Sequence, residues 1–220
     1  HGVIDSPDIP LNVSRSYLQS DGNVKKINSY ITKKVADKLT ELYKDDRKSY
    51  EEKWKDINLF VKYGMISEEK FYEKVEKIAL LQSLDNKMRT FDEYKKFVSK
   101  TQKDKDKNTV ILYSNDAEKQ DSYIEDAKKR NYDVVLFDNV IDSHYINHIE
   151  QKLNKVQIKR VDADILDKLI DKDEKKETVI KDEDKESLKK LFEKIINNQS
   201  TVVNVESLNP DESPVIITLP

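Results

Sequence analysis

The spacing of apolar residues changes near residue 108, and this change constrains the fold more than any other feature of the sequence. Before it, apolar residues recur every three or four positions, as on one face of an amphipathic helix. After it, residues 109–113 and 133–137 are short continuous apolar runs, typical of strands covered on both faces. A helical pattern separates these runs, and a second helical pattern and an alternating run at 156–160 follow. The order predicts an α/β fold (α+β overall), in which a helical segment precedes a small β-α-β-α-β lobe with a parallel sheet.

Helices are predicted before residue 108 over residues 24–42, 50–64, 67–84 and 90–97. Gly64 is expected to end the second helix in the left-handed conformation that suits glycine. Ser67 is expected to cap the third helix, which has acidic residues in its first turn. Thr90 and Glu93 match a capping box and therefore predict the start of the fourth helix.

A highly charged stretch follows the predicted lobe. Residues 163–186 are dominated by Asp, Glu and Lys, which predicts a charged linker. An amphipathic helix is predicted over 188–196, and residues 201–205 and 215–219 are predicted to be strands that open a further α+β unit. Because the chain begins with His1 and ends just after a strand-like run, we expect it to be a piece of a longer protein.

The composition excludes several classes of function. The 220 residues include no Cys, which excludes disulfides, thiolate metal sites and cysteine nucleophiles. The 3 Gly cannot form a phosphate-binding loop or a dinucleotide fingerprint. The 40 basic residues are balanced by 43 acidic ones, so the net charge of −3 gives no general cationic field for nucleic acid. No apolar run approaches the roughly 18 residues of a membrane span. We therefore expect neither nucleic acid nor a membrane as a partner, and a reducing cytoplasm suits the chain.

Three features leave alternatives open. His144 and His148 share one helix face and could bind a metal, but no third ligand completes a pattern, and a partly exposed helix face is the simpler interpretation. Lysines interleaved with aromatic residues could bind single-stranded nucleic acid by stacking, but the periodicity places most of these aromatic residues in cores. The spacing of Trp54 with Tyr50 and Ile57 indicates a core residue, and the alternative is an exposed contact with a partner.

Residues 2–19 form the most informative stretch, and they read GVIDSPDIPLNVSRSYLQ. Ser14 is a good N-cap, which places Arg15 at the first position of a helix. There the guanidinium could add donors to helix N–H groups that face an anion such as a phosphate. The alternative is an ion pair between Arg15 and Asp5 or Asp8, and the residues alone favour this ion pair.

The same stretch resembles the catalytic loop of the heat-shock protein 90 chaperone family, whose pattern runs G-V-[VI]-D-S-x-D-[LI]-P-L-N-[LIV]-S-R-x-x-L-Q. The resemblance extends over essentially the whole chain and is weakest in residues 162–186. It implies the later part of the middle domain of that family, followed by the start of its C-terminal domain. The implied units are the catalytic loop at the end of the large middle-domain lobe (1–20), a helical segment (21–100), a small α/β lobe (108–162), a charged linker (163–186) and the truncated start of the dimerisation domain (187–220).

The resemblance also implies a role in ATP hydrolysis. In the family, the arginine that matches Arg15 contacts the γ-phosphate of ATP held by a separate N-terminal domain, and the residue that matches Gln19 supports the same region. ATP and its Mg²⁺ would then be bound mainly by that missing domain. We therefore expect no cofactor in this chain and no ATP hydrolysis by this chain alone, although the full-length parent would be an ATPase. The chain departs from many relatives at Ser16, where they carry Glu.

The partners implied by the resemblance are unfolded or partly folded client proteins. Relatives present client-contacting side chains on the helix that matches residues 142–153, which here includes His144 and Asn147. The family acts in the cytoplasm, in the heat-shock response and in protein folding. Its full-length members are homodimers, whereas this chain is expected to be a monomer. The alternative function is a non-enzymatic protein-interaction module of the same fold, in which Arg15 would not affect any activity.

Overall fold

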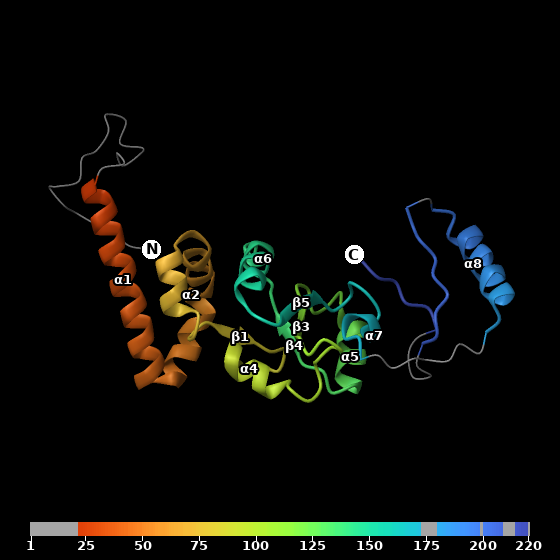
Figure 1. Ribbon diagram of the computed structural model, residues 1–220, viewed down its shortest axis with the longest axis horizontal. Coiled ribbons are helices and arrows are strands. Elements are labelled where there is room, and N and C mark those ends of the chain that lie inside the picture. The colour runs from red at the N-terminus through yellow and green to blue at the C-terminus, as the bar shows by residue number, and fades with distance from the viewer. Residues whose placement is uncertain (1–21, 173–179, 199, 209–213, 220) are drawn as a thin grey trace.

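The structure is a computed structural model, and it describes residues 22–172, 180–198, 200–208 and 214–219. The implied catalytic loop, including Arg15 and Gln19, lies outside the described residues. The described part begins with three helices that lie together at one end of the molecule (Figure 1). These are α1 (Gly22–Asp45), α2 (Arg47–Ser67) and α3 (Glu69–Val75).

Gly64 does not end α2, and this expectation was wrong. The helix continues to Ser67, and no described glycine has a positive φ. A Cβ atom at position 64 would lie 2.8 Å from the Phe71 ring, so the glycine is needed for the close approach of α3 to α2. Ser67 does not cap α3 either, because its hydroxyl donates to the Tyr63 carbonyl within α2, and Glu68 takes the cap position without a side-chain hydrogen bond.

The third predicted helix ends early, at Val75, and a β-hairpin follows it. Strand β1 (Leu80–Gln82) pairs antiparallel with β2 (Met88–Thr90), with Leu81 opposite Arg89. Residues 78–81 are four successive apolar residues, each at most 5% exposed. A surface helix buries only one stripe of its residues, so a run buried at every position fits an extended segment better than a helix.

The predicted capping box is confirmed at the start of α4 (Phe91–Phe97). The Glu93 N–H donates to Thr90 Oγ1 over 3.3 Å, and the Thr90 N–H donates to Glu93 Oε2 over 2.7 Å. After α4, the chain reaches the sheet through Gln102, which is fully buried. The Gln102 side chain accepts from the Asp133 N–H and donates to the carbonyls of Val110 and Asp133.

The predicted parallel sheet is confirmed. It contains β3 (Thr109–Ser114), β4 (Val134–Leu136) and β5 (Val156–Arg160) in the order β4-β3-β5. The crossovers carry α5 (Asp121–Lys129) and α6 (Asp142–Lys152). The first of these helices begins at Asp121, and the residues before it, 117–120, form a turn.

The two faces of the sheet belong to two apolar clusters. Val110 and Leu112 pack in one cluster with Ile124 of α5. Ile111 lies in the other cluster with Ile149 of α6, and this cluster is continuous with the buried residues of α1, α2 and α3. The two crossover helices therefore cover opposite faces of the sheet. The sheet face that α6 covers packs against the helical segment.

Ordered structure extends into the stretch that was expected to be a charged linker. Helix α7 (Leu166–Leu169) lies within it, and Leu166, Leu169 and Ile170 are buried in the α5-side cluster. These apolar side chains lie among acidic residues, and their burial stabilises the packing of the stretch against the small lobe. The predicted domain boundaries otherwise stay predictions.

The last described segments differ from the expectation. Helix α8 (Asp182–Ile196) contains the helix predicted over 188–196 but begins six residues earlier; it buries none of its residues and lies at the far end of the molecule from α1 (Figure 1). Residues 201–205 and 215–219 form no strand in the described part of the chain, so that prediction was wrong. Strands need a paired neighbour, and these segments do not pair with each other. Among the helices of the described ranges, none combines the length and the apolar character needed to cross a membrane.

Candidate functional site

The exposed side of α6 carries two of the site residues proposed from the sequence. His144 and Asn147 are both exposed, one turn apart, together with Ser143. Val140 precedes the helix and is 93% exposed. These side chains form what we call the α6 face, a surface with hydrogen-bonding groups beside an apolar residue. Such a mixed surface can contact a partner, and it contains no nucleophile paired with a base.

The start of α6 is fixed to α2 by a buried ion pair. Lys62 Nζ lies 2.6 Å from Asp142 Oδ1, and the two side chains are only 6% and 3% exposed. The other carboxylate oxygen of Asp142 accepts from the Asn139 N–H over 3.0 Å. The Lys62 ammonium also lies 5.1 Å from the centre of the Phe137 ring, within range of a cation–π contact.

Burial sets the electrostatics of this junction. Removal of Lys62 from water lowers the pKa of its ammonium, and the negative charge of Asp142 acts in the opposite direction. Burial likewise raises the pKa of the neighbouring Tyr145 phenol, whose hydroxyl lies 3.7 Å from Met65 Sδ. The junction is therefore a desolvated contact in which each polar group has a named partner.

Further contacts hold the rest of α6. Asn139 Nδ2 donates to Asn58 Oδ1 over 3.1 Å, which ties the loop before α6 to α2. Near the other end, Lys152 forms an ion pair with Glu69 of α3. The α6 face therefore lies on a helix whose first residue is attached to α2 and whose last residue is attached to α3.

His148 does not join His144 in a metal site in the described part of the chain. Its ring lies edge-on to Tyr72, with 5.4 Å between ring centres, and its Nε2 atom is buried without a hydrogen-bond partner among the described residues. The ranges that the structure describes contain no group of three or more His, Cys, Asp or Glu side chains placed to hold a metal. Burial, followed by the charges of Glu76 and Glu69, raises the pKa of Tyr72 to about 12.

Trp54 lies in the core, which confirms the core interpretation of its spacing. It is 3% exposed, and its ring centre lies 5.7 Å from that of Tyr50. Almost none of this side chain is available to a partner, so the alternative of an exposed contact at Trp54 was wrong.

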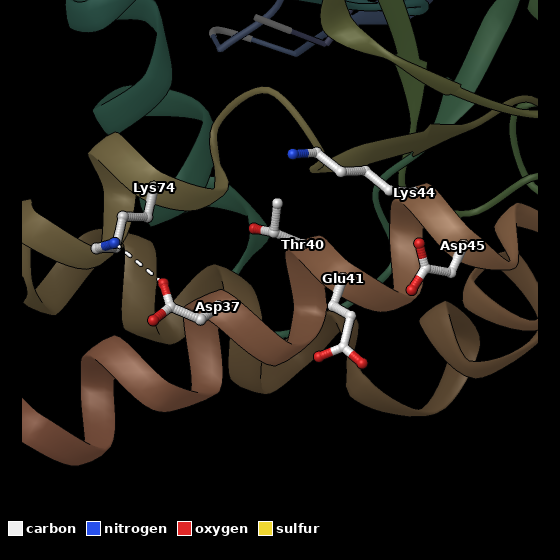
Figure 2. Close-up of a pocket in the computed structure, with 6 residues that line it drawn as sticks. All are labelled: Asp37, Thr40, Glu41, Lys44, Asp45 and Lys74. Atoms are coloured by element: carbon white, nitrogen blue, oxygen red, sulfur yellow. Dashed lines mark hydrogen bonds and ion pairs between the residues drawn. The ribbon is translucent and has the colours of Figure 1, made fainter.

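A depression of about 470 Å³ lies beside α1 and α3, and it does not form a binding site. Figure 2 shows that Asp37 and Lys74 point toward each other, and their ion pair measures 3.1 Å. The Glu41 carboxylate points away from this pair (Figure 2). A ligand site needs polar groups that converge on one point, and the lining residues do not converge.

Sequence reasoning missed the Lys62–Asp142 pair, whose members are 80 residues apart. One local signal was present. Lys62 directly follows the core residue Val61 and lies four positions after Asn58, on the same side of α2. Nothing in the sequence around Asp142 identifies Lys62 as its partner.

Comparison with known proteins gives consistent matches over nearly the whole chain. The family model described as Hsp90 protein matches residues 1–219. The chain is 48% identical over 221 residues to the chaperone protein HtpG of Bacteroides thetaiotaomicron and to that of Porphyromonas gingivalis. Each match covers 99% of this chain and 32% of the relative, so the chain spans about a third of the length of these curated relatives.

A more distant relative and a solved structure are also similar to this chain. The HtpG protein of Bdellovibrio bacteriovorus is 30% identical over 183 residues, which is 80% of this chain and 28% of that protein. The middle domain of a Plasmodium falciparum heat shock protein superposes with a TM-score of 0.50 at 16% identity, over 66% of this chain and 60% of that one. At this identity the superposition shows the fold alone, and it agrees with the predicted α/β class.

Proposed function

Because the chain belongs to the heat-shock protein 90 family, we propose that it is the middle segment of an ATP-dependent chaperone. In this proposal the parent protein supplies an N-terminal domain that binds ATP and Mg²⁺, and this chain binds unfolded or partly folded proteins. The observation that carries the proposal is the family match over residues 1–219, which includes the stretch around Arg15.

Arg15 is proposed to stabilise the charge on the γ-phosphoryl group during hydrolysis, with Gln19 supporting the contact. A guanidinium is permanently protonated and offers a planar fork of donors, which suits a phosphoryl group. An arginine finger of this kind contributes about 10³–10⁵ in rate in other nucleotide hydrolases. A finger carried on a separate domain makes hydrolysis depend on the approach of the two domains.

Steady-state ATP turnover of the full-length parent protein tests this role. Arg15→Ala should reduce turnover by about 10³ or more while nucleotide binding is retained. Arg15→Lys should restore turnover only in part, because an ammonium lacks the planar fork. Unchanged turnover with Arg15→Ala would reject the proposed role and favour the non-enzymatic interaction module.

The α6 face is proposed to contact client proteins. It is exposed, it combines polar and apolar groups, and its helix is held at both ends. Binding of a permanently unfolded protein to this chain should weaken several-fold in the His144→Ala/Asn147→Ala double variant. A matched control on the opposite side of the sheet is Ser122→Ala/Glu125→Ala on α5, which should bind normally. Equal binding by both variants would remove the α6 face from the proposal.

We also propose that this chain is a monomer by itself, that the parent protein is a homodimer and that it acts in the cytoplasm. The absence of Cys suits a reducing compartment. Light scattering should give a mass near 25.8 kDa for the isolated chain. A mass near twice that value would contradict the monomer.

A further inference from the structure

The outer side of β5, which we call the β5 edge, is blocked at two places by hydrogen bonds from the lobe itself. The Ile158 N–H donates to the Glu150 carboxylate of α6 over 2.6 Å. The Arg160 carbonyl accepts from the Ala163 N–H over 3.1 Å, in the turn that follows the strand. A further strand needs a row of unpaired N–H and carbonyl groups along an edge. These two bonds therefore interrupt the row that such a strand would need along the second half of β5.

The last described residues of the chain attach to the turn after β5, and three hydrogen bonds hold them there. The Leu219 N–H donates to the Asp162 carbonyl over 2.9 Å. The Arg160 guanidinium donates to the Leu219 carbonyl, and the Tyr123 hydroxyl of α5 donates to the Ile217 carbonyl. Figure 1 shows the end of the chain returning toward α7 and β5. The segment is therefore attached through its backbone, and it adds no strand to the sheet.

The small lobe positions the groups that make this contact. Arg160 Nε donates to the carboxylate of Asp162, which is buried, so the guanidinium is held in place for its bond to the segment. Burial and the charge of Asp162 raise the pKa of the Tyr123 phenol, so its hydroxyl remains a donor. An oriented guanidinium loses less freedom for each hydrogen bond that it forms. The three groups are therefore ready for the segment before it arrives.

The contact is weak, because it lies at the surface. Residues 217–219, which we call the held segment, keep their terminal side chains largely in water, with Ile217 70% exposed and Leu219 55% exposed. Backbone hydrogen bonds add little net stability here, since water can replace them when the segment leaves. The nearby ion pair of Lys168 with Glu206 is also partly exposed and contributes little. The held segment can therefore leave and return without unfolding of the lobe.

The entropy of the chain opposes the contact. Among the described residues, Ile170 is the last that lies in either apolar cluster. Helix α8 follows it and buries none of its residues. Attachment of the held segment closes this stretch of chain into a loop, and loop closure costs conformational entropy. A few weak bonds set against this cost give two states of comparable free energy, one held and one released.

The position of α8 depends on which state is present. In the held state, the chain ties α8 to the small lobe on both sides, whereas in the released state it does so on one side only. Leu191 and Ile195 lie one turn apart on α8 and are 52% and 68% exposed. Release therefore changes where the molecule presents this apolar face.

We infer that Tyr123, Arg160 and Asp162 form a latch, the C-terminal latch, which reversibly holds residues 217–219 on the small lobe and so sets the position of α8. The inference goes beyond the proposed function, because it needs neither ATP nor a client protein. It is carried by three hydrogen bonds to one short backbone segment, made by groups that the lobe has already oriented.

Hydrogen exchange at the Leu219 amide of the full 220-residue chain tests whether the latch holds. The reference is the free heptapeptide PVIITLP, which has the sequence of residues 214–220 and no lobe to contact. The amide should exchange about ten-fold more slowly in the chain than in the peptide, because the Asp162 carbonyl accepts its proton in the held state. Equal exchange rates would show that the segment is not held and would overturn the inference.

Variants of the latch test which groups hold the segment. Tyr123→Phe should speed exchange at Leu219 about three-fold, and Arg160→Gln should bring it close to the rate in the peptide, because a charged donor forms the stronger bond. Tyr63→Phe, at an exposed tyrosine of α2, is the matched control and should leave the rate unchanged. Unchanged exchange at the buried Leu112 amide of β3 reports that the lobe stays folded. Protection that survives in both latch variants would contradict the assigned contacts.

Energy transfer between two dyes tests whether the latch sets the position of α8. Because the chain contains no Cys, Gln151→Cys on α6 and Ser187→Cys on α8 give two unique attachment points, both at exposed residues. Leu219→Pro removes the N–H that bonds to Asp162 and leaves the lobe unchanged, so it should raise the ratio of released to held molecules about ten-fold. Leu219→Ala keeps the N–H and should leave the distribution of transfer efficiencies as it is. A distribution that Leu219→Pro does not change would mean that the latch does not place α8, and the inference would fail.

Discussion

The α2–α6 junction and the β5 edge both join segments that are far apart in sequence, but they do so by different physical means. At the junction, a desolvated ion pair between Lys62 and Asp142 lies among aromatic side chains. Beside the β5 edge, in the turn after the strand, hydrogen bonds to the backbone of residues 217–219 hold this segment while its side chains remain largely in water. A buried contact of matched side chains accepts one partner, whereas an exposed backbone contact can exchange partners. The comparison therefore predicts that the free energy of unfolding lost when a contact is broken is largest at the junction and smallest at the edge.

The largest effect is expected at the junction. Asp142→Ala leaves the Lys62 ammonium buried without a counter-charge, which should lower the free energy of unfolding by about 3–5 kcal/mol. Urea unfolding of the chain measures this change. The double variant Lys62→Met/Asp142→Ala should recover part of the loss, because no charge stays buried. Additive losses in the double variant would mean that the pair does not act as a unit.

A smaller effect is expected where α2 meets α3. Gly64→Ala places a methyl group 2.8 Å from the Phe71 ring and should cost about 1–3 kcal/mol through overpacking. Thermal unfolding measures the loss, and Gly22→Ala is the matched control, since no atom of the described residues lies within 4 Å of its added Cβ. Equal stability of the two variants would show that α3 moves away at no cost.

The capping box of α4 provides an intermediate case. Thr90→Ala removes the acceptor of the Glu93 N–H and should cost about 1 kcal/mol. Ser67→Ala is the comparison variant, because the Ser67 hydroxyl donates back into α2 and caps no helix, so its removal should have little effect. A larger loss at Ser67 than at Thr90 would contradict the assigned helix starts.

The smallest effect is expected near the β5 edge. Lys168→Ala breaks the half-exposed ion pair with Glu206 and should change the free energy of unfolding by no more than about 0.5 kcal/mol. Its effect should be seen instead as faster hydrogen exchange at the Leu219 amide. A large loss of stability would show that the C-terminal segment is part of the folded core, and the contrast with the junction would then fail.

Patterns of neighbouring residues predicted those strands and helix starts that are determined by residues close together in the chain. Continuous apolar runs identified β3 and β4, and the Thr90–Glu93 pair identified the start of α4. The hairpin of β1 and β2 was missed, because the apolar residues at its start continue the helical spacing of α3. Gly64 was misread, because its role depends on Phe71 on another helix.

The candidate site was predictable to a lesser degree. The exposure of His144 and Asn147 follows from the periodicity of α6. The partner of Asp142 and the groups around residues 217–219 could not be found, because each contact joins residues separated by tens of positions. The roles of Arg15 and Gln19 rest on the resemblance of residues 2–19 to the catalytic loop of the family, and they remain predictions.

The Glu150 carboxylate has a further consequence for copies of this chain at high concentration. Two exposed edge strands can pair side by side, and repeated pairing produces ordered aggregates. Because Glu150 already accepts the Ile158 N–H, a second β5 cannot align along the full length of the first. At the carboxyl end of the strand, the Arg160 carbonyl accepts from the Ala163 N–H over 3.1 Å, so the edge is closed to the long register that fibre growth requires.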